Sequence, residues 1–405
     1  MPNKKIQDST LLTLGLSGSS FGTALSDFFI PLFIYKLTGD PLLMALQFFF
    51  NFLGNIAAAQ FVIKNKFTSN DRTSCMLLDF IAFLTMISAT QVSAQILPTY
   101  LYFVSFIISF MGTASGGYYE SLVGAISNNS SSENRQSIVS KIHTGENIGS
   151  FAGYAAAAFI LTATSYKFAF FLDALTYGFS MFFLSKLENS GVSLQLKKQT
   201  HSHSVFGTLF SKRIKLLSIS HGIAGFGLST FSASSIFILK DYFKSPDSTI
   251  SIFYMSQFAA NILGSYLAYF FVTNKYQLTE HEGWKIRLLY GIPLLSGWFL
   301  PNAVSYILFF AFFSAVHSFS IPMYLSFFQR GVDQHEWKIV GASRKTLVSI
   351  VGLFSSLTCG SLLKITSFRP IYLGVSGFIF VSAFFLFLHA KSIPELNIAK
   401  NNSDS

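Results

Sequence analysis

The sequence predicts an all-α integral membrane protein whose twelve transmembrane helices form two parallel six-helix repeats. Three observations predict it: too little charge for a water-exposed surface, twelve apolar runs of membrane-spanning length, and motifs that recur half a chain apart. Hydrophobic residues make up 51% of the 405-residue chain and charged residues only 11%, whereas a soluble domain carries about 25% charged residues. The net charge of +10 could indicate nucleic-acid binding, but no basic patch lies on a soluble face, so we expect no nucleic-acid partner.

Twelve apolar runs are long enough to cross a bilayer, whose core of about 30 Å requires roughly 20 apolar residues in a helix. They are too long, and alternate too little, for the strands of a membrane barrel. The division between the ninth and tenth runs is the weakest, because only Pro301 and Asn302 separate them. The predicted spans are residues 11–35, 42–63, 74–95, 98–124, 144–164, 168–187, 214–239, 249–273, 286–301, 303–326, 340–363 and 370–389.

The positions of lysine and arginine predict the orientation of these spans. If both termini are cytoplasmic, the inner segments hold 22 of the 28 basic residues, which is a strong positive-inside signal. We therefore expect a multi-pass protein of a bacterial-type cytoplasmic membrane, in contact with anionic lipid. The predicted organisation is an N-terminal bundle over 1–187, a cytoplasmic linker over 188–213, a C-terminal bundle over 214–391 and a polar cytoplasmic tail over 392–405.

Short motifs of the first half recur in the second half in the same order. Asn51-Phe52-Leu53-Gly54 returns as Asn261-Ile262-Leu263-Gly264, and Ser140-Lys141 with Gly149 returns as Ser343-Arg344 with Gly352. Tyr35-Lys36 before Asp40-Pro41 has a looser echo in Leu239-Lys240 before Ser245-Pro246. Two parallel six-helix halves of this kind place a substrate path between them.

Several stretches of the first half also resemble one known transporter superfamily. They are Leu25-Ser26-Asp27, Leu37-Thr38-Gly39-Asp40-Pro41, Asp71-Arg72, Leu78-Asp79, Gly145-Glu146-Asn147-Ile148-Gly149 and Phe171-Leu172-Asp173-Ala174-Leu175-Thr176-Tyr177-Gly178. In these the chain resembles the major facilitator superfamily, and more narrowly its twelve-span drug and siderophore exporters, such as macrolide efflux proteins and the enterobactin exporter. The resemblance covers spans one to six by motif and the second half by layout. It implies proton-coupled export of an amphiphilic small molecule by a monomer.

The segment between spans two and three departs from the pattern of that superfamily. It keeps basic charges at Lys64 and Lys66 and the pair Asp71-Arg72, but Gln60 stands where a glycine is expected. The Gly-Pro of the fifth span of many exporters is Gly149-Ser150 in this chain. Both departures weaken the assignment to a proton-coupled antiporter and leave the fold unaffected. The candidates for a cytoplasmic gate are Lys64, Lys66, Asp71, Arg72, Glu146 and Arg344.

Ionisable residues deep in a span are the candidates for proton coupling, since each costs about 2.5–3.5 kcal/mol to insert. Asp27 is the clearest, because it lies near mid-membrane; the alternative is a neutral acid bonded to Ser or Thr neighbours. Asp79 and Asp173 are further candidates, for which packing or gating is the favoured interpretation. His317 is the fourth, although a satisfied interior histidine is the favoured interpretation there.

Polar uncharged residues indicate where a substrate cavity lies, although they also suit packing between helices. The first span of each half is rich in serine and threonine, and the second span of each half carries amides one turn apart. The cavity candidates are Ser20, Thr23, Gln47, Asn51, Ser229, Ser232, Gln257 and Asn261.

Two other functions fit the same sequence. One is import of a small solute, for instance a ferric siderophore, by the same fold; the other is a membrane scaffold or receptor that does not transport. We expect no cofactor, because the chain has no nucleotide-binding Gly-x-x-x-x-Gly-Lys-Ser/Thr loop and no His-Glu-x-x-His metal motif. An intramembrane enzyme is not expected, because no nucleophile and base lie at matching depth.

Overall fold

The computed structural model describes residues 2–64, 71–93, 95–127, 132–163, 166–187, 209–211, 214–273, 280–330 and 337–392. In this part of the chain the long helices are α1 (Pro2–Thr38), α2 (Pro41–Lys64), α3 (Asp71–Ala89), α4 (Leu97–Ser127), α5 (Ser132–Ala163), α6 (Tyr166–Lys186), α8 (Lys215–Phe237), α9 (Asp247–Thr273), α10 (Glu280–Ser296), α11 (Ala303–Arg330), α12 (Trp337–Ile365) and α13 (Phe368–Ser392). A π-helical turn, η1 (Ile238–Tyr242), extends α8, and a 3-10 turn, η2 (Gly297–Phe299), follows α10. The predicted linker over 188–213 lies largely outside the described residues.

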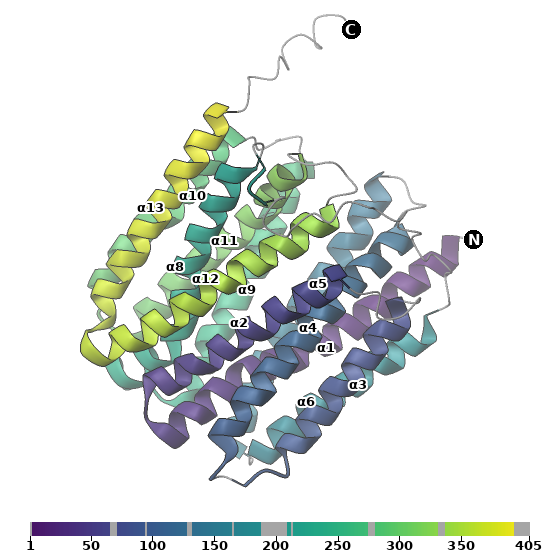
Figure 1. The fold of residues 1–405 in the computed structure, drawn as a ribbon, viewed down its shortest axis with the longest axis horizontal. Helices are drawn as coiled ribbons and strands as arrows, with labels where there is room; N and C mark the ends of the chain where they lie inside the picture. The colour runs from purple at the N-terminus through teal and green to yellow at the C-terminus, as the bar shows by residue number, and fades with distance from the viewer. Residues whose placement is uncertain are drawn as a thin grey trace, which may run out of the picture.

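The helices lie side by side in one bundle, and α1 begins at the same end of it at which α13 ends (Figure 1). We call this end the terminal end and the other, which carries the connection between α1 and α2, the opposite end. Because each of the twelve long helices crosses the bundle once, the chain ends on the side at which it begins. The predicted all-α fold class with twelve transmembrane helices is thereby confirmed.

Eight helices of the described part are long and apolar enough to cross a membrane by length and composition. They are α2, α3, α4, α6, α8 with its η1 extension, α11, α12 and α13. Large apolar side chains also cover the outside of the bundle, among them Phe182, Leu308 at 66% exposed and Ile365 at 80% exposed. A surface of this kind is stable against lipid and not against water, so the chain is a multi-pass membrane protein.

The uncertain boundary between the ninth and tenth spans has a structural basis in Asn302. The Asn302 side chain accepts a hydrogen bond from the backbone N–H of Ser305 at 2.9 Å, and the Ser305 hydroxyl accepts one from the backbone N–H of Asn302 at 3.3 Å. This reciprocal cap satisfies two donors at the start of α11. Together with Pro301 it ends one helix and starts the next within a few residues.

The two halves are packed alike. In the first half α1 packs on α5 and α6, α2 on α4, and α3 on α6; in the second half α8 packs on α12 and α13, α9 on α11, and α10 on α13. The halves meet through two further pairs, α2 with α12 and α5 with α9. The interface between the halves is therefore built from the second and fifth helices of each repeat.

The repeated Asn-x-x-Gly motif marks equivalent helix crossings. A Cβ added at Gly54 would lie 2.3 Å from the carbonyl oxygen of Phe106 on α4, and one at Gly264 would lie 2.1 Å from that of Ala315 on α11. In both crossings only glycine allows so close an approach of the two backbones.

A hydrogen bond follows each of these glycines. The Thr113 hydroxyl donates to Asn55 at 2.6 Å in the first half, and the hydroxyls of Ser265 and Ser318 lie 3.2 Å apart in the second. The sequence repeat is thus a repeat of helix packing.

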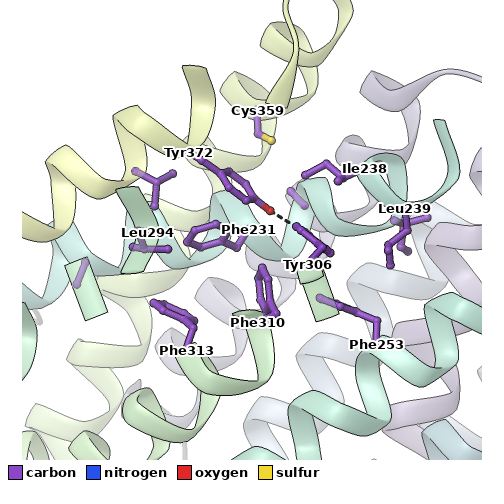
Figure 2. Close-up of a cluster of buried hydrophobic side chains, with 14 of the residues drawn as sticks. Phe231, Ile238, Leu239, Phe253, Leu294, Tyr306, Phe310, Phe313, Cys359 and Tyr372 are labelled. Carbon is purple, nitrogen blue, oxygen red and sulfur yellow. Dashed lines mark hydrogen bonds between the residues drawn. The ribbon is translucent and has the colours of Figure 1, made fainter. Parts of the chain in front are cut away.

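An aromatic cluster holds the second half together (Figure 2). Figure 2 shows the Tyr306 and Tyr372 side chains pointing at one another, and their hydroxyls lie 2.6 Å apart. Phe231 of α8 meets the Tyr372 ring edge-on at 4.6 Å and the Phe310 ring at 5.2 Å. Each such ring pair contributes about 0.5–1.5 kcal/mol beyond buried area, so the cluster fixes α8, α11 and α13 as one unit.

Candidate transport site

Asp27 lies in the middle of α1, enclosed by the bundle, with a side chain that remains accessible. Its neighbours Ser26 and Phe28 are buried. From Asp27 to the end of α1 the helix rises about 17 Å, which places the carboxyl group near the middle of a bilayer. Within the described chain no side chain forms an ion pair or hydrogen bond with it. Its charge is available to a proton or a ligand.

The surroundings of Asp27 come from three helices and from both halves. Its charge acts on Tyr154 of α5, on Asp173 of α6 and on Tyr254 of α9. Thr23 and Ser20, two of the predicted cavity residues, lie one and two turns before it along α1; Ser20 is half-buried and Thr23 exposed. Spacings of three and four residues put these side chains on one face of the helix.

A stack of three aromatic rings crosses the interface beside Asp27. Tyr154 lies between Tyr254, at 4.9 Å and 13°, and Phe258, at 4.8 Å and 27°. Phe28 of α1 meets the Tyr254 ring edge-on at 6.0 Å. Aromatic rings on both sides of the interface and one accessible carboxyl group can bind a partly apolar molecule together with a positive charge or a proton.

The other predicted cavity residues are placed as follows. Gln47 is only 2% exposed. Asn51 is half-buried and accepts a hydrogen bond from Asn55 at 3.3 Å. Gln257 and Asn261 of α9 are half-buried, and Ser229 of α8 is buried; the side chain of Ser232 lies outside the described part of the structure.

Of the remaining proton-coupling candidates, Asp79 and Asp173 are buried and His317 is half-buried. The Asp173 carboxyl group accepts a hydrogen bond from Ser26, and that of Asp79 accepts one from Ser180 at 2.7 Å. His317 is half-buried in α11, with its ring parallel to that of Phe313 at 6.3 Å. Asp173 and Asp79 lie in the first half, and His317 lies in the second.

The predicted cytoplasmic gate is only partly described. Asp71 is the first residue of α3, and the Arg72 guanidinium donates a hydrogen bond to the carbonyl oxygen of Leu187 at the end of α6. Glu146 of α5 and Arg344 of α12 are half-buried. Lys66 and the side chain of Lys64 lie outside the described residues.

A network of ion pairs joins the two halves at the opposite end of the bundle, and sequence reasoning missed it. Asp247, the first residue of α9, pairs with Lys36 of α1 and with Lys240 of η1. Lys364 near the end of α12 pairs at 2.6 Å with Asp40, which lies between α1 and α2. We call these five residues the opposite-end network; the Tyr35 hydroxyl adds a hydrogen bond to Asp241 beside it.

One sequence signal could have pointed to this network. The echo of Tyr35-Lys36 in Leu239-Lys240 places two lysines at equivalent ends of the two repeats. Both of them converge on Asp247. Their shared acidic partner, Asp247, is not part of the echo, so the echo indicates where the lysines lie but not which acid they contact.

The acids of the network keep their charge at ordinary pH. Partial burial acts to raise the pKa of both acids, but hydrogen bonds outweigh it. Those from Lys364 and Leu42 lower the pKa of Asp40 below its ordinary value of 3.8. Those from Lys240 and Lys36 lower the pKa of Asp247 in the same way. A lowered pKa means that the stabilisation is fully present above about pH 4 and is lost as the pH falls through the shifted value. Between pH 5 and pH 8 the network therefore does not respond to protons.

Substitution of Asp247 by asparagine should loosen the opposite end. Half-exposed ion pairs contribute about 1 kcal/mol at most. This free energy corresponds to about a fivefold change in the population of the closed arrangement, in which the opposite-end network is formed. Spin labels at the exposed positions Leu37 and Ser248 should show a larger share of long distances, in the same way at pH 5 and pH 8. Lys167→Gln, at an exposed cation of the same end, is the matched control. An unchanged distance distribution in Asp247→Asn would contradict a closing role.

Comparison with known proteins identifies the fold. No protein-family model and no curated protein matches the sequence. Among solved structures, the chain is similar to the nucleoside transporter NupG, with 16% identity over 96% of this chain and 99% of that one and a TM-score of 0.73. It is similar to a D-xylose-proton symporter, with 12% identity over 97% and 98% of the two chains and a TM-score of 0.74. The chain has the all-helical fold that these two transporters share.

Proposed function

Starting from the major facilitator fold, we propose that the protein is a proton-coupled secondary transporter that exports an amphiphilic small molecule. The observation that carries the proposal is the accessible carboxyl group of Asp27, enclosed between helices of both halves. Ionising a group at this depth costs about 2.5–3.5 kcal/mol, so its proton affinity changes when its surroundings open or close. Rocking of the two halves about a central site supplies that change.

The substrate class follows from the walls around Asp27. The rings of Tyr254 and Phe258 suit a large, partly apolar or aromatic molecule, and the polar residues of α1 suit its hydrogen-bonding groups. A siderophore or a drug has this character. We place the terminal end in the cytoplasm of a bacterial-type inner membrane, because most lysines and arginines lie on that side. The opposite-end network then closes the external side of a monomer that loads its substrate from the cytoplasm.

Import of a small solute is the second candidate. It is favoured by the likeness to a nucleoside transporter and to a D-xylose-proton symporter. In this version a proton binds Asp27 from outside together with the solute, and the same rocking carries both inward. The two candidates share the fold, the carboxyl group and the aromatic walls, and differ only in the direction of the solute.

Mass spectrometry of culture medium and cell extract, with and without the gene, distinguishes the two under iron limitation. Export predicts a compound that disappears from the medium and accumulates in the cells when the gene is removed. A compound of the medium that stays unconsumed without the gene would instead establish import. A strain that carries the gene with Lys167→Gln controls for expression of a variant chain.

A further inference from the structure

We propose that protons pass from Asp27 to the terminal end through the interior of the first half, by way of Asp173 and Asp79, and not through the space that holds the substrate. The inference rests on the proposed coupling role of Asp27. It concerns two buried acids that the substrate site does not use. Asp173 is 1% exposed and Asp79 is 3% exposed, so neither can bind a solute directly.

The first link joins Asp27 to Asp173. The hydroxyl of Ser26, the residue before Asp27, donates a hydrogen bond to the Asp173 carboxyl group, and the charge of Asp27 acts on Asp173. Thr176 adds a hydroxyl 3.5 Å from the same carboxyl group. The Ser26 hydroxyl therefore connects α1, directly beside Asp27, with the Asp173 carboxyl group of α6.

The second link runs along α6 from Asp173 to Asp79. Tyr177, on the next turn of α6, is subject to the charges of Asp173, Asp79 and Asp27 together. Ser180, one turn further, donates to Asp79 at 2.7 Å. From Asp173 to Ser180 the helix rises about 10 Å, so this link spans about a third of the bilayer core.

The path continues toward the terminal end through α3 and α4. The Tyr119 hydroxyl lies 2.9 Å from that of Ser180 and donates to Asp79 at 3.4 Å. The Cys75 thiol is one turn from Asp79, is subject to the charges of Asp79 and Asp71, and donates to the carbonyl oxygen of Ser115. The Ser115 hydroxyl is 4% exposed and has no partner among the described residues. In the proposed path this hydroxyl binds a water molecule that carries the proton onward.

Packing alone does not require an acid at Asp173, because the second half builds the equivalent contact without one. A Cβ added at Gly22 of α1 would lie 2.4 Å from the Asp173 carboxyl group and 2.0 Å from the Thr176 hydroxyl. At the equivalent crossing of α8 with α13, Gly227 instead faces the apolar side chains of Val375 and Ile379. Two aliphatic residues are enough for helix packing there, so the costly acid Asp173 of the first half serves another purpose.

Each step of the path breaks one O–H bond and forms another. A proton that leaves the carboxylic acid of Asp27 is taken up by the Asp173 carboxylate, to which the Ser26 hydroxyl donates a hydrogen bond. From Asp173 a proton passes to the Asp79 carboxylate by way of the Ser180 hydroxyl, which releases its own proton to Asp79 as it accepts one. Only a proton moves. No described lysine or arginine forms an ion pair with Asp79 or Asp173.

Time-resolved infrared spectroscopy of the purified protein in lipid nanodiscs tests the path. The carboxylic-acid band of Asp27 is identified by its loss in Asp27→Asn, and its decay is followed after a jump to alkaline pH. Asp173→Val, which copies Val375, and Asp79→Asn should each slow this decay by about tenfold, or about 1.4 kcal/mol in barrier, without changing its final amplitude. Gly178→Ala on α6, where an added Cβ meets nothing within 4 Å, should leave it unchanged.

The outcomes separate the path from the coupling role itself. An Asp27 band that titrates at the wild-type rate in both variants would overturn the path and leave Asp27 as the coupling site. A wild-type protein whose Asp27 never changes protonation would overturn the proposed coupling, and the path with it. A variant that fails to fold is recognised by size-exclusion chromatography, and the other variant then decides.

Discussion

Replacement of Asp27 by asparagine is expected to abolish proton-coupled transport while leaving the protein folded in the membrane. The side chain makes no ion pair or hydrogen bond within the described chain, so its loss removes no contact of the fold. Asparagine has nearly the same shape and cannot bind and release a proton. Cells that carry the variant in place of the natural gene should retain the exported compound to the same extent as cells that lack the gene.

The control for this experiment is a variant at an equally accessible position. Lys167→Gln, at an exposed position of α6 outside the site, should transport at close to the natural rate. Membrane levels of both variants are compared by immunoblot. Normal transport with an unchanged pH dependence in Asp27→Asn would contradict the coupling role.

The largest effect on stability is expected from Gly54→Ala. The added methyl group would lie 2.3 Å from the backbone carbonyl oxygen of Phe106, so α2 and α4 must separate. Overpacking of this kind costs about 1–3 kcal/mol, and the gain of about 1 kcal/mol in helix propensity offsets only part of it. The apparent Tm of the purified protein should fall by several degrees, and Gly264→Ala should behave alike because it faces Ala315 in the same way.

Gly112→Ala is the matched control for the glycine substitutions. This residue also lies in α4, and an added Cβ there meets nothing within 4 Å. Its apparent Tm should stay the same or rise. Equal effects of Gly54→Ala and Gly112→Ala would show that helix propensity, and not the close approach of α2 and α4, controls stability.

The sequence allowed the fold to be predicted because its signals are local. Span length follows from apolar runs, and the recurrence of Asn51-Phe52-Leu53-Gly54 identifies two helices that cross their neighbours in the same way. Asp27 could be placed near mid-membrane from its distance along one helix. Pro301 and Asn302 indicated a boundary between two helices, and in the structure the Asn302 side chain caps the start of α11.

The rotation of a helix and its contacts with distant segments could not be predicted in the same way. Gln47 was expected in the cavity, and the structure leaves only 2% of it exposed. A helix that is apolar all round has no polar stripe to reveal which way one amide faces. Lys364 and Asp40 are 324 residues apart, and neither has a sequence feature that selects the other. The opposite-end network therefore became visible only in the structure.

Vesicles that contain only the purified protein provide the most direct test of proton-coupled transport. The compound identified by mass spectrometry is supplied outside, and its uptake is followed while the vesicle interior is made acidic. Export in exchange for protons predicts accumulation driven by this gradient and its loss in Asp27→Asn. Binding of the compound without flux under a gradient of either direction would contradict transport and favour a receptor or scaffold.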